Sequence, residues 1–310
     1  MKDIHFPQKK KQKIILISYA NDAYRAAQEL QTKTAKTAGF TDVIEYGPKD
    51  IEESFKEANA EIFKYKRGNG LWLWKPYLIK KTLDNMKDGE ILFYCDSGAC
   101  FFRNVDGILS KLQEQDVWVS VLPLKEKQFT KQKTFDILDC NTEEYKESAQ
   151  ISGTFCAFKK SELSTRFVDE WLQYCCDIKA LAPPEDKTQE ARYFYDHRED
   201  QSILSLLVKK YKLKAWSDPS QYGRLPEKYI RNGCEMVYYG DHVGQEDYPI
   251  CLIHHRTKDG NRKVLLNQLL CAVLPRKIGL MFIDGKTKQG GVSDSLLIRL
   301  SIAEGRPCYA

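Results

Sequence analysis

The chain has 310 residues, a length that suits one large α/β domain. Hydrophobic residues make up 42% and aromatic residues 12%, which is enough for a substantial core. The net charge of +5 is small and spread along the chain, so it excludes a nucleic-acid-binding protein that works through a strongly basic surface. No apolar run approaches the roughly 18 residues that cross a bilayer.

The cysteines and the basic N-terminal cluster bear on the cellular compartment. The ten cysteines are scattered, and none forms a C-x-x-C pair. Several lie inside apolar stretches, which predicts buried, reduced thiols in a cytoplasmic protein. The cluster Lys9–Lys13 reads as a solvated chain end, and peripheral contact with an acidic membrane surface is the functional alternative.

Strands and helices alternate through the first half of the chain. Apolar runs predict the strands, and amphipathic stretches with polar starts predict the helices. Gly39 lies just past the first helix, and Pro76 suits the first turn of the third. The predicted strands are 13–20, 41–47, 90–96 and 116–124, and the predicted helices are 21–39, 50–66 and 72–87.

The second half is less regular. A strand from 150 runs into a helix over 163–177, and a polar, proline-bearing loop follows over 180–191. A further helix begins near Glu199 or Asp200, and short strands are predicted at 212–216 and 235–239. An apolar strand from 250 ends in His254, His255 and Arg256, and a helix is predicted over 263–275.

This alternation predicts an α/β fold with a mainly parallel, Rossmann-like sheet and helices on both faces. Ligands of such sheets bind beyond the carboxyl ends of the strands. Ser18–Ala20 and Asp96 both follow the carboxyl ends of predicted strands, so we expect them to face one cleft.

Two quoted segments carry a resemblance to a known family. The block RGNGLWLWKPYLIKKTL, followed by GEILFYCDSG, resembles the GT-A glycosyltransferases, in particular bacterial and viral-type capsule and lipopolysaccharide enzymes. QISGTFCAFKKSE and HREDQSILSLL also resemble segments of this family in the same order, and the similarity covers about residues 13–260. It implies a GT-A-like domain over residues 1–275.

The resemblance implies a hexosyl- or pentosyltransferase that moves a sugar from a nucleoside-diphosphate donor, UDP- or GDP-linked, to a glycan or other hydroxyl acceptor. Growing negative charge on the diphosphate requires a divalent cation or a basic side chain. By this resemblance the nucleoside pocket is lined by Ser18, Tyr19 and Ala20. Lys75 would meet the phosphates.

The same resemblance implies roles for residues of the second half. Gly153 would let the backbone pass close to the donor. Asp200 and Gln201 would hold the sugar, since Asp and Gln together accept and donate hydrogen bonds. Asp196 is a candidate base for the acceptor hydroxyl.

The metal motif of the family is Asp-x-Asp, and this chain departs from it. Asp96 matches the first acid, but Gly98 stands where the second is expected. The resemblance implies Mn²⁺ or Mg²⁺ bound by Asp96 with His254 or His255, since carboxylate oxygen and imidazole are acceptable ligands. The missing acid puts metal dependence in doubt.

Each of these residues also has a purely structural interpretation. Lys75 reads equally as a solvent-exposed lysine at a helix start, and Asp200 as a helix N-cap. Trp72 and Trp74 fit the core better than a sugar platform. His197 fits a hydrogen-bonded loop residue better than a base.

Two other functions fit the sequence less well. Gly98 motivates a catalytically weakened nucleotide- or sugar-binding protein. A metal hydrolase using Asp96, His197 and His254 is disfavoured, because the chain has no H-E-x-x-H or paired-histidine spacing.

Residues 276–310 form a separate unit in this interpretation. A strand from 277, the Gly290–Gly291 turn and a helix headed by Asp294 predict either a C-terminal extension or the start of a second αβ domain, similar to a GT-B domain. A single unit of this kind buries too little surface to be stable alone, so we expect the natural chain to continue beyond Ala310.

Overall fold

The computed structural model describes residues 12–229, 234, 235, 237 and 247–279. Its centre is a five-stranded sheet. The strands are, in spatial order, β2 (Asp42–Tyr46), β1 (Ile14–Tyr19), β3 (Ile91–Cys95), β6 (Ala149–Lys159) and β5 (Val117–Lys125). β1 pairs in parallel with β2 and β3, whereas β6 is antiparallel to both β3 and β5. Only β6 therefore runs against the others, which confirms the predicted α/β fold with a mainly parallel sheet.

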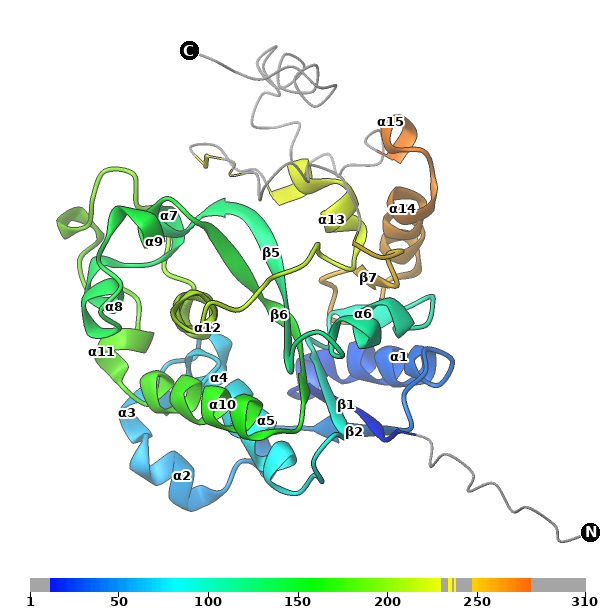
Figure 1. Ribbon diagram of the computed structural model, residues 1–310, viewed down its shortest axis with the longest axis horizontal. Helices are drawn as coiled ribbons and strands as arrows, with labels where there is room; N and C mark the ends of the chain where they lie inside the picture. The colour runs from blue at the N-terminus through cyan, green and yellow to red at the C-terminus, as the bar shows by residue number, and fades with distance from the viewer. Residues whose placement is uncertain (1–11, 230–233, 236, 238–246, 280–310) are drawn as a thin grey trace, which may run out of the picture.

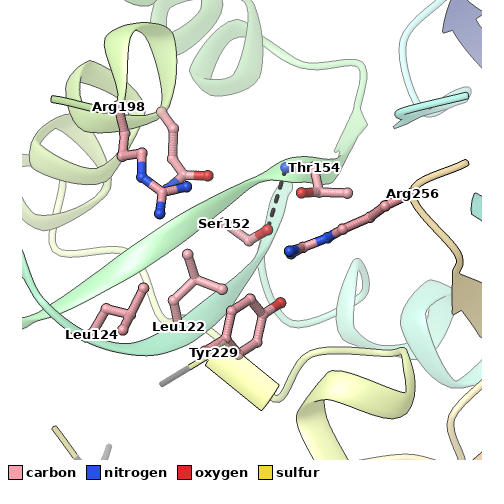
Figure 2. Close-up of a pocket in the computed structure, with 8 residues that line it drawn as sticks. Leu122, Leu124, Ser152, Thr154, Arg198, Tyr229 and Arg256 are labelled. Atoms are coloured by element: carbon pink, nitrogen blue, oxygen red, sulfur yellow. Dashed lines mark hydrogen bonds between the residues drawn. The ribbon is translucent and has the colours of Figure 1, made fainter. Parts of the chain in front are cut away.

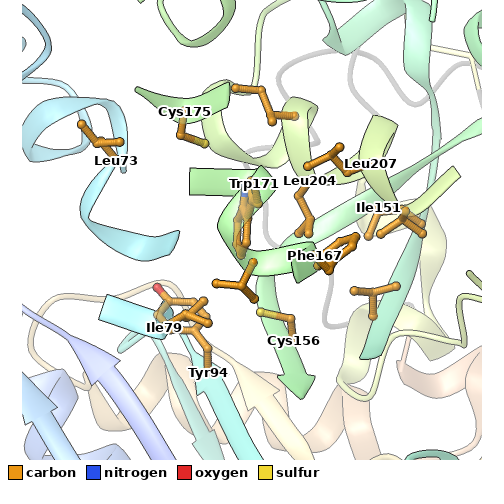
Figure 3. Close-up of a cluster of buried hydrophobic side chains, with 14 of the residues drawn as sticks. Leu73, Ile79, Tyr94, Ile151, Cys156, Phe167, Trp171, Cys175, Leu204 and Leu207 are labelled. Carbon is orange, nitrogen blue, oxygen red and sulfur yellow. The ribbon is translucent and has the colours of Figure 1, made fainter. Parts of the chain in front are cut away.

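Helices cover both faces of the sheet (Figure 1). One face carries α5 (Trp74–Asp84), α10 (Glu162–Cys175) and α12 (Glu199–Lys210), whose apolar sides bury the larger core cluster around Tyr94, Cys156 and Trp171 (Figure 3). The other face carries α1 (Arg25–Ala35), α6 (Asp106–Lys111) and a two-stranded sheet of β4 (Ala99–Phe101) and β7 (Leu252–His254).

Shorter helices complete the described fold. They are α2 (Glu53–Ala58), α3 (Ala60–Phe63), α4 (Gly68–Leu71), α7 (Glu126–Phe129), α8 (Gln132–Ile137), α9 (Glu143–Lys146), α11 (Ile178–Leu181), α13 (Gln221–Arg224), α14 (Arg262–Val273) and α15 (Arg276–Gly279). Short 3₁₀ turns lie at Asp22–Tyr24, Pro48–Asp50, Lys187–Gln189 and Pro226–Tyr229.

Several predicted boundaries are wrong, for local reasons. The single helix predicted over 50–66 is interrupted at Asn59, whose side chain donates to the Phe55 carbonyl at 2.9 Å and so competes with the helical ladder. The first helix begins with a 3₁₀ turn, and Asn21 makes no capping hydrogen bond there. The late apolar strand pairs with β4, a strand missed from the sequence, rather than joining the central sheet.

A left-handed stretch precedes α5. Gly68, Asn69, Gly70, Leu71 and Trp72 all have positive φ, between 53° and 92°. The L-residues in it are strained, since each left-handed residue of this kind costs roughly 1–2 kcal/mol. Trp74 holds the stretch in place by donating its indole N–H to the Gly68 carbonyl at 2.8 Å.

The described structure also bears on the expectations for the cysteines, for a membrane span and for the strand predicted from 277. The nine described cysteines are free thiols, and only Cys176 among them is exposed. In the described residues no helix combines the length and apolarity that a membrane span requires. The start of the strand predicted from 277 lies in α15. Lys9–Lys11, most of 235–239 and residues 280–310 lie outside the described residues.

Candidate active site

Lys75 is the centre of a buried charged cluster. It is the second residue of α5, and only 3% of its surface is exposed. Its ammonium lies 2.9 Å from Oδ2 of Asp200, 2.9 Å from the Gly153 carbonyl oxygen and 3.8 Å from Oδ1 of Asp96. The interpretation of Lys75 as a solvent-exposed lysine is therefore wrong, because its ammonium is buried, donates to the Gly153 carbonyl and pairs with two carboxylates inside the protein.

The cluster keeps its charges in spite of burial. Desolvation alone would lower the pKa of Lys75, but the carboxylates of Asp200 and Asp96 raise that pKa above its usual value. Burial raises the pKa of Asp200 to about 6, against the opposing effect of Lys75. At neutral pH the cluster therefore holds an ammonium between two carboxylates.

Asp96 is the partly open member of the cluster. It directly follows β3, and its backbone N–H donates to the Thr154 carbonyl at 2.8 Å, which fixes it to β6. The Tyr94 hydroxyl donates to Oδ1 at 2.5 Å. The side chain is 33% exposed, so a bound molecule can reach this carboxylate.

Gly153 and Gln201 lie against each other. The Gly153 N–H donates to Oε1 of Gln201 at 3.0 Å. A Cβ on Gly153 would sit 3.0 Å from Cβ of Gln201, so a larger residue would push Gln201 back by a few tenths of an ångström. Glycine here allows the close approach between β6 and α12.

Asp200 does not cap α12, so that interpretation is wrong. The N-cap position belongs to Arg198, and Asp200 is the second helical residue. Glu199 between them has a φ of 42°, which turns the chain sharply into the helix. Trp171 donates its indole N–H to the Asp200 carbonyl at 3.0 Å and anchors the turn from the core side.

A polar network behind Gln201 was missed from the sequence. Nε2 of Gln201 donates to Oε1 of Gln150 at 2.8 Å, and Nε2 of Gln150 donates to the fully buried carboxylate of Glu126 at 3.3 Å. Ser205 and Lys209 bind the other carboxylate oxygen. The sequence carries no signal for this network, because Glu126 and Lys209 look like ordinary surface charges within polar stretches.

The expected nucleoside-pocket residues lie at the carboxyl end of β1 and are buried. The Ser18 hydroxyl accepts from Nε2 of Gln28 at 3.2 Å, and Ala20 is 1% exposed. Tyr19 stacks on Trp74 with ring centroids 3.8 Å apart. Trp74 is therefore a core residue, as expected from its apolar neighbours.

Asp196 belongs to a separate set of ion pairs at the start of α12. Arg67 lies 3.3 Å from it and Lys187 3.1 Å from it, and Arg67 also pairs with Glu199 at 2.7 Å. Although burial raises it, the pKa of Asp196 is lowered overall by Lys187 and Arg67. A carboxylate with a lowered pKa is a weaker proton acceptor.

His197 is a structural residue, as expected. It is fully buried, its Nδ1 accepts from the Lys131 N–H at 3.3 Å, and its Nε2 meets the Ala180 carbonyl at 3.1 Å. Burial lowers its pKa to about 3, so it stays neutral. Its engaged ring nitrogens remove the support for a metal hydrolase that uses this residue.

The two late histidines lie in different surroundings. The His254 ring contacts Phe155 and Tyr222, with centroids 5.9 and 5.7 Å away. Nδ1 of His255 accepts from the Thr257 N–H at 3.1 Å, so its Nε2 carries the proton and cannot ligate a metal ion in that tautomer. Only His254 then keeps the imidazole lone pair that a metal requires.

In the described part of the chain no group of three His, Cys, Asp or Glu side chains gathers where it could hold a metal ion. Gly98 removes the second carboxylate, and the ammonium of Lys75 stands close to the first. These residues do not fit a metal ion held by three protein side chains.

The structure brings together five of the predicted site residues, which come from four separate segments: Lys75, Asp96, Gly153, Asp200 and Gln201. Asp196 contacts other partners. The cluster lies at the carboxyl end of β3, where α/β sheets bind ligands.

Comparisons with known proteins give matches in structure only. No protein-family model matches the sequence, and no curated protein matches it. Solved structures that resemble the chain include the galactosyltransferase LgtC in complex with donor and acceptor sugar analogs, at 12% identity and a TM-score of 0.43, over 85% of this chain and 98% of that one.

Two further matches are glycosyltransferases. Mouse xyloside xylosyltransferase 1 is 11% identical with a TM-score of 0.41, over 82% of this chain and 98% of that one. The glycosyltransferase GlyE of Streptococcus pneumoniae is 12% identical with a TM-score of 0.37, over 90% of this chain and 64% of that one. At these scores and identities the likeness carries no argument about activity.

Proposed function

We propose that this protein is a glycosyltransferase that moves a sugar from a nucleoside-diphosphate donor to a hydroxyl acceptor. The observation that carries the proposal is the cluster of Lys75 with Asp96, Gly153 and Asp200. A buried ion pair at the ligand-binding edge of a sheet contributes little net stability by itself. Perturbed ionisable groups in such a place favour a functional role.

The donor nucleotide binds beside the carboxyl ends of β1 and β3 in this proposal. Asp96 accepts hydrogen bonds from the ribose, since its carboxylate is partly open and its orientation is fixed by Tyr94. Asp200 and Gln201 hold hydroxyls of the donor sugar. Gly153 lets Gln201 pack directly on β6 and so positions its amide for the sugar.

Transfer breaks the bond between the anomeric carbon and the diphosphate oxygen and forms a bond to the acceptor oxygen. The nucleoside diphosphate leaves, and it takes up the proton of the acceptor hydroxyl. Lys75 acts by position in this proposal: it pairs with Asp200, donates to the Gly153 carbonyl and lies 3.8 Å from Asp96, so it aligns the two carboxylates. Preorganised charges of this kind stabilise charge that develops in the transition state.

The finer identity of the substrates comes from the sequence resemblance. We propose a UDP- or GDP-linked hexose or pentose as donor and a glycan of a surface polysaccharide as acceptor. A requirement for Mn²⁺ or Mg²⁺ stays a prediction. Asp96 would be its one carboxylate ligand, with His254 as the candidate imidazole.

A thermal-unfolding panel tests the proposal. UDP, GDP, ADP and CMP are added to the full chain with and without Mn²⁺, because a ligand that binds the native state raises the midpoint of unfolding. We expect a shift with UDP or GDP that is lost in Asp96→Asn. Donor turnover with release of that nucleotide separates a transferase from a binding protein, and the absence of any nucleotide shift at millimolar concentration would overturn the proposal.

A further inference from the structure

A pocket lies beside Gln201. β5 and β6 form its floor, the start of α12 forms one wall, and the segment after β7 forms the other (Figure 2). It encloses about 490 Å³ including its open mouth. Its polar lining consists of Ser152, Thr154, Arg198, Gln201, Tyr229 and Arg256, beside two leucines.

Arg256 enters the pocket from the segment after β7. Its φ is 57°, and its N–H donates to the Gly98 carbonyl at 2.9 Å, so the backbone that carries it is fixed. The guanidinium lies over the Tyr222 ring, 4.5 Å from the centroid, and 5.8 Å from that of Tyr229. Within the described chain no carboxylate lies at ion-pair distance from it.

Asp218 is a buried acid close enough for the charge of Arg256 to affect its pKa, but both of its oxygens already accept hydrogen bonds. Burial raises the pKa of Asp218 overall, although the charge of Arg256 acts to lower it. Oδ1 of Asp218 accepts from Ser220 at 2.6 Å, and Oδ2 accepts from the Tyr229 hydroxyl at 2.6 Å. Among the described residues, therefore, no carboxylate pairs directly with Arg256.

Arg198 faces Arg256 across the floor strand. Its guanidinium lies 4.9 Å from the Phe129 ring centroid, and both guanidinium groups point toward the space above Ser152 (Figure 2). Among the residues that the structure describes, no carboxylate lines this pocket. Two planar guanidinium groups with hydroxyl donors between them match the oxygens of a phosphate or carboxylate group.

Resting on the function proposed above, we propose that this pocket binds the anionic group of an acidic acceptor, a sugar phosphate or a uronic acid. The position of the pocket in the sheet favours the acceptor over the donor as its ligand. The expected nucleotide site lies beside β1 and β3, whereas the pocket lies on β6 and β5, the next two strands of the sheet. Gln201 lines this pocket and also contacts Gly153, so it stands between the two sites.

Inorganic phosphate is the probe, added to the full chain at constant ionic strength with and without a saturating concentration of UDP or GDP. We expect phosphate to raise the midpoint of unfolding further in the presence of the nucleotide. In Arg256→Gln the apparent Kd for phosphate should rise at least about tenfold, as for loss of a charge-assisted hydrogen bond. Arg166→Gln removes an exposed arginine of α10 and should leave the Kd unchanged.

A second variant keeps the test decisive if Arg256→Gln fails to fold. Thr154→Val conserves volume, removes one hydroxyl of the pocket and should weaken phosphate binding in the same direction. Phosphate that competes with the nucleotide would show that the pocket holds the donor diphosphate, and equal phosphate binding by Arg256→Gln and wild type would exclude an anion site; either result overturns the proposal. If neither nucleotide binds, the proposed function fails, while Arg256-dependent phosphate binding still supports the anion site.

Discussion

Gln201 donates its Nε2 hydrogen to Oε1 of Gln150, 2.8 Å away, and the direction of that bond is dictated by Glu126. A carboxylate only accepts, so Gln150 must present its NH₂ group to Glu126 and its oxygen to Gln201. Gln201 is then forced to present its own oxygen to the Gly153 N–H. One buried carboxylate thereby sets the orientation of two amides and of the proposed sugar contact.

We predict that Glu126→Gln disrupts this orientation. Lys209 attracts the oxygen of the new amide, so its nitrogen faces Gln150. Gln150 must then accept from residue 126 and donate to Gln201, which reverses the direction of both hydrogen bonds. Loss of the carboxylate that pairs with Lys209 also costs roughly 3–5 kcal/mol of stability. The double variant Glu126→Leu with Lys209→Met removes both charges and the acceptor that orients Gln150, so it should fold while its kcat stays low. Full kcat in the folded double variant would show that Glu126 is only structural.

Lys75→Met should destabilise the fold strongly. It leaves two carboxylates facing each other without a cation, and breaking a buried pair in this way costs roughly 3–5 kcal/mol. Lys80→Met is the matched control on the same helix, because its pairs with Asp84 and Asp169 are partly exposed and such pairs contribute roughly 0–1 kcal/mol. Urea unfolding at neutral pH measures both, and equal costs would contradict the assignment of Lys75 as the buried centre.

Asp96→Asn should lower transferase activity while leaving the free energy of unfolding nearly unchanged. The partly exposed carboxylate contributes little to the core, whereas loss of an electrostatic contact in the active site typically lowers kcat by about 10²–10³-fold. We therefore expect a folded protein with little transferase activity and weak nucleotide binding. Near-normal turnover would reduce Asp96 to a turn residue after β3.

Glu199 predicts a pH dependence of stability. Burial raises its pKa from 4.5 to about 7, despite the opposing effect of Arg67, while Asp200 and Asp196 raise it further. The folded protein thus holds a proton that the unfolded chain has already released, so stability falls as pH rises from 4.5 to about 7. Asp200, whose pKa is raised to about 6, adds to the same slope. Glu199→Gln should therefore flatten the slope without abolishing it, and Glu144→Gln on the exposed surface of α9 should leave it unchanged. Urea unfolding at pH values from 4.5 to about 7 measures this slope. An unchanged slope in Glu199→Gln would contradict the raised pKa assigned to Glu199.

The late histidines should differ when tested singly. His254→Ala should change any Mn²⁺ dependence of activity, whereas His255→Ala should not, because Nε2 of His255 carries a proton. Activity is titrated with Mn²⁺ after treatment with EDTA. If both variants behave as wild type, histidine plays no part in metal binding.

The apolar runs predict the main strands and place Asp96 at the carboxyl edge of the sheet. The positions of Lys75 and Asp200 beside it are expected only from the family resemblance, because both residues lie at the starts of helices. The sequence misses the Glu126 network and the Arg198–Arg256 pocket. Both depend on the irregular pairing of β5 with β6 and on left-handed residues such as Arg256, which no periodic pattern encodes. The broken helix after β2 was missed for a similar local reason at Asn59.

The left-handed stretch from Gly68 to Trp72 also fixes the rotation of α5 about its own axis. Each residue of an α-helix turns the chain by about 100°. Inserting or deleting one residue between Trp72 and Lys75 would therefore swing the ammonium about a quarter turn away from its carboxylates. Homologous chains should accordingly keep the length of this short segment constant, even where its residue types change.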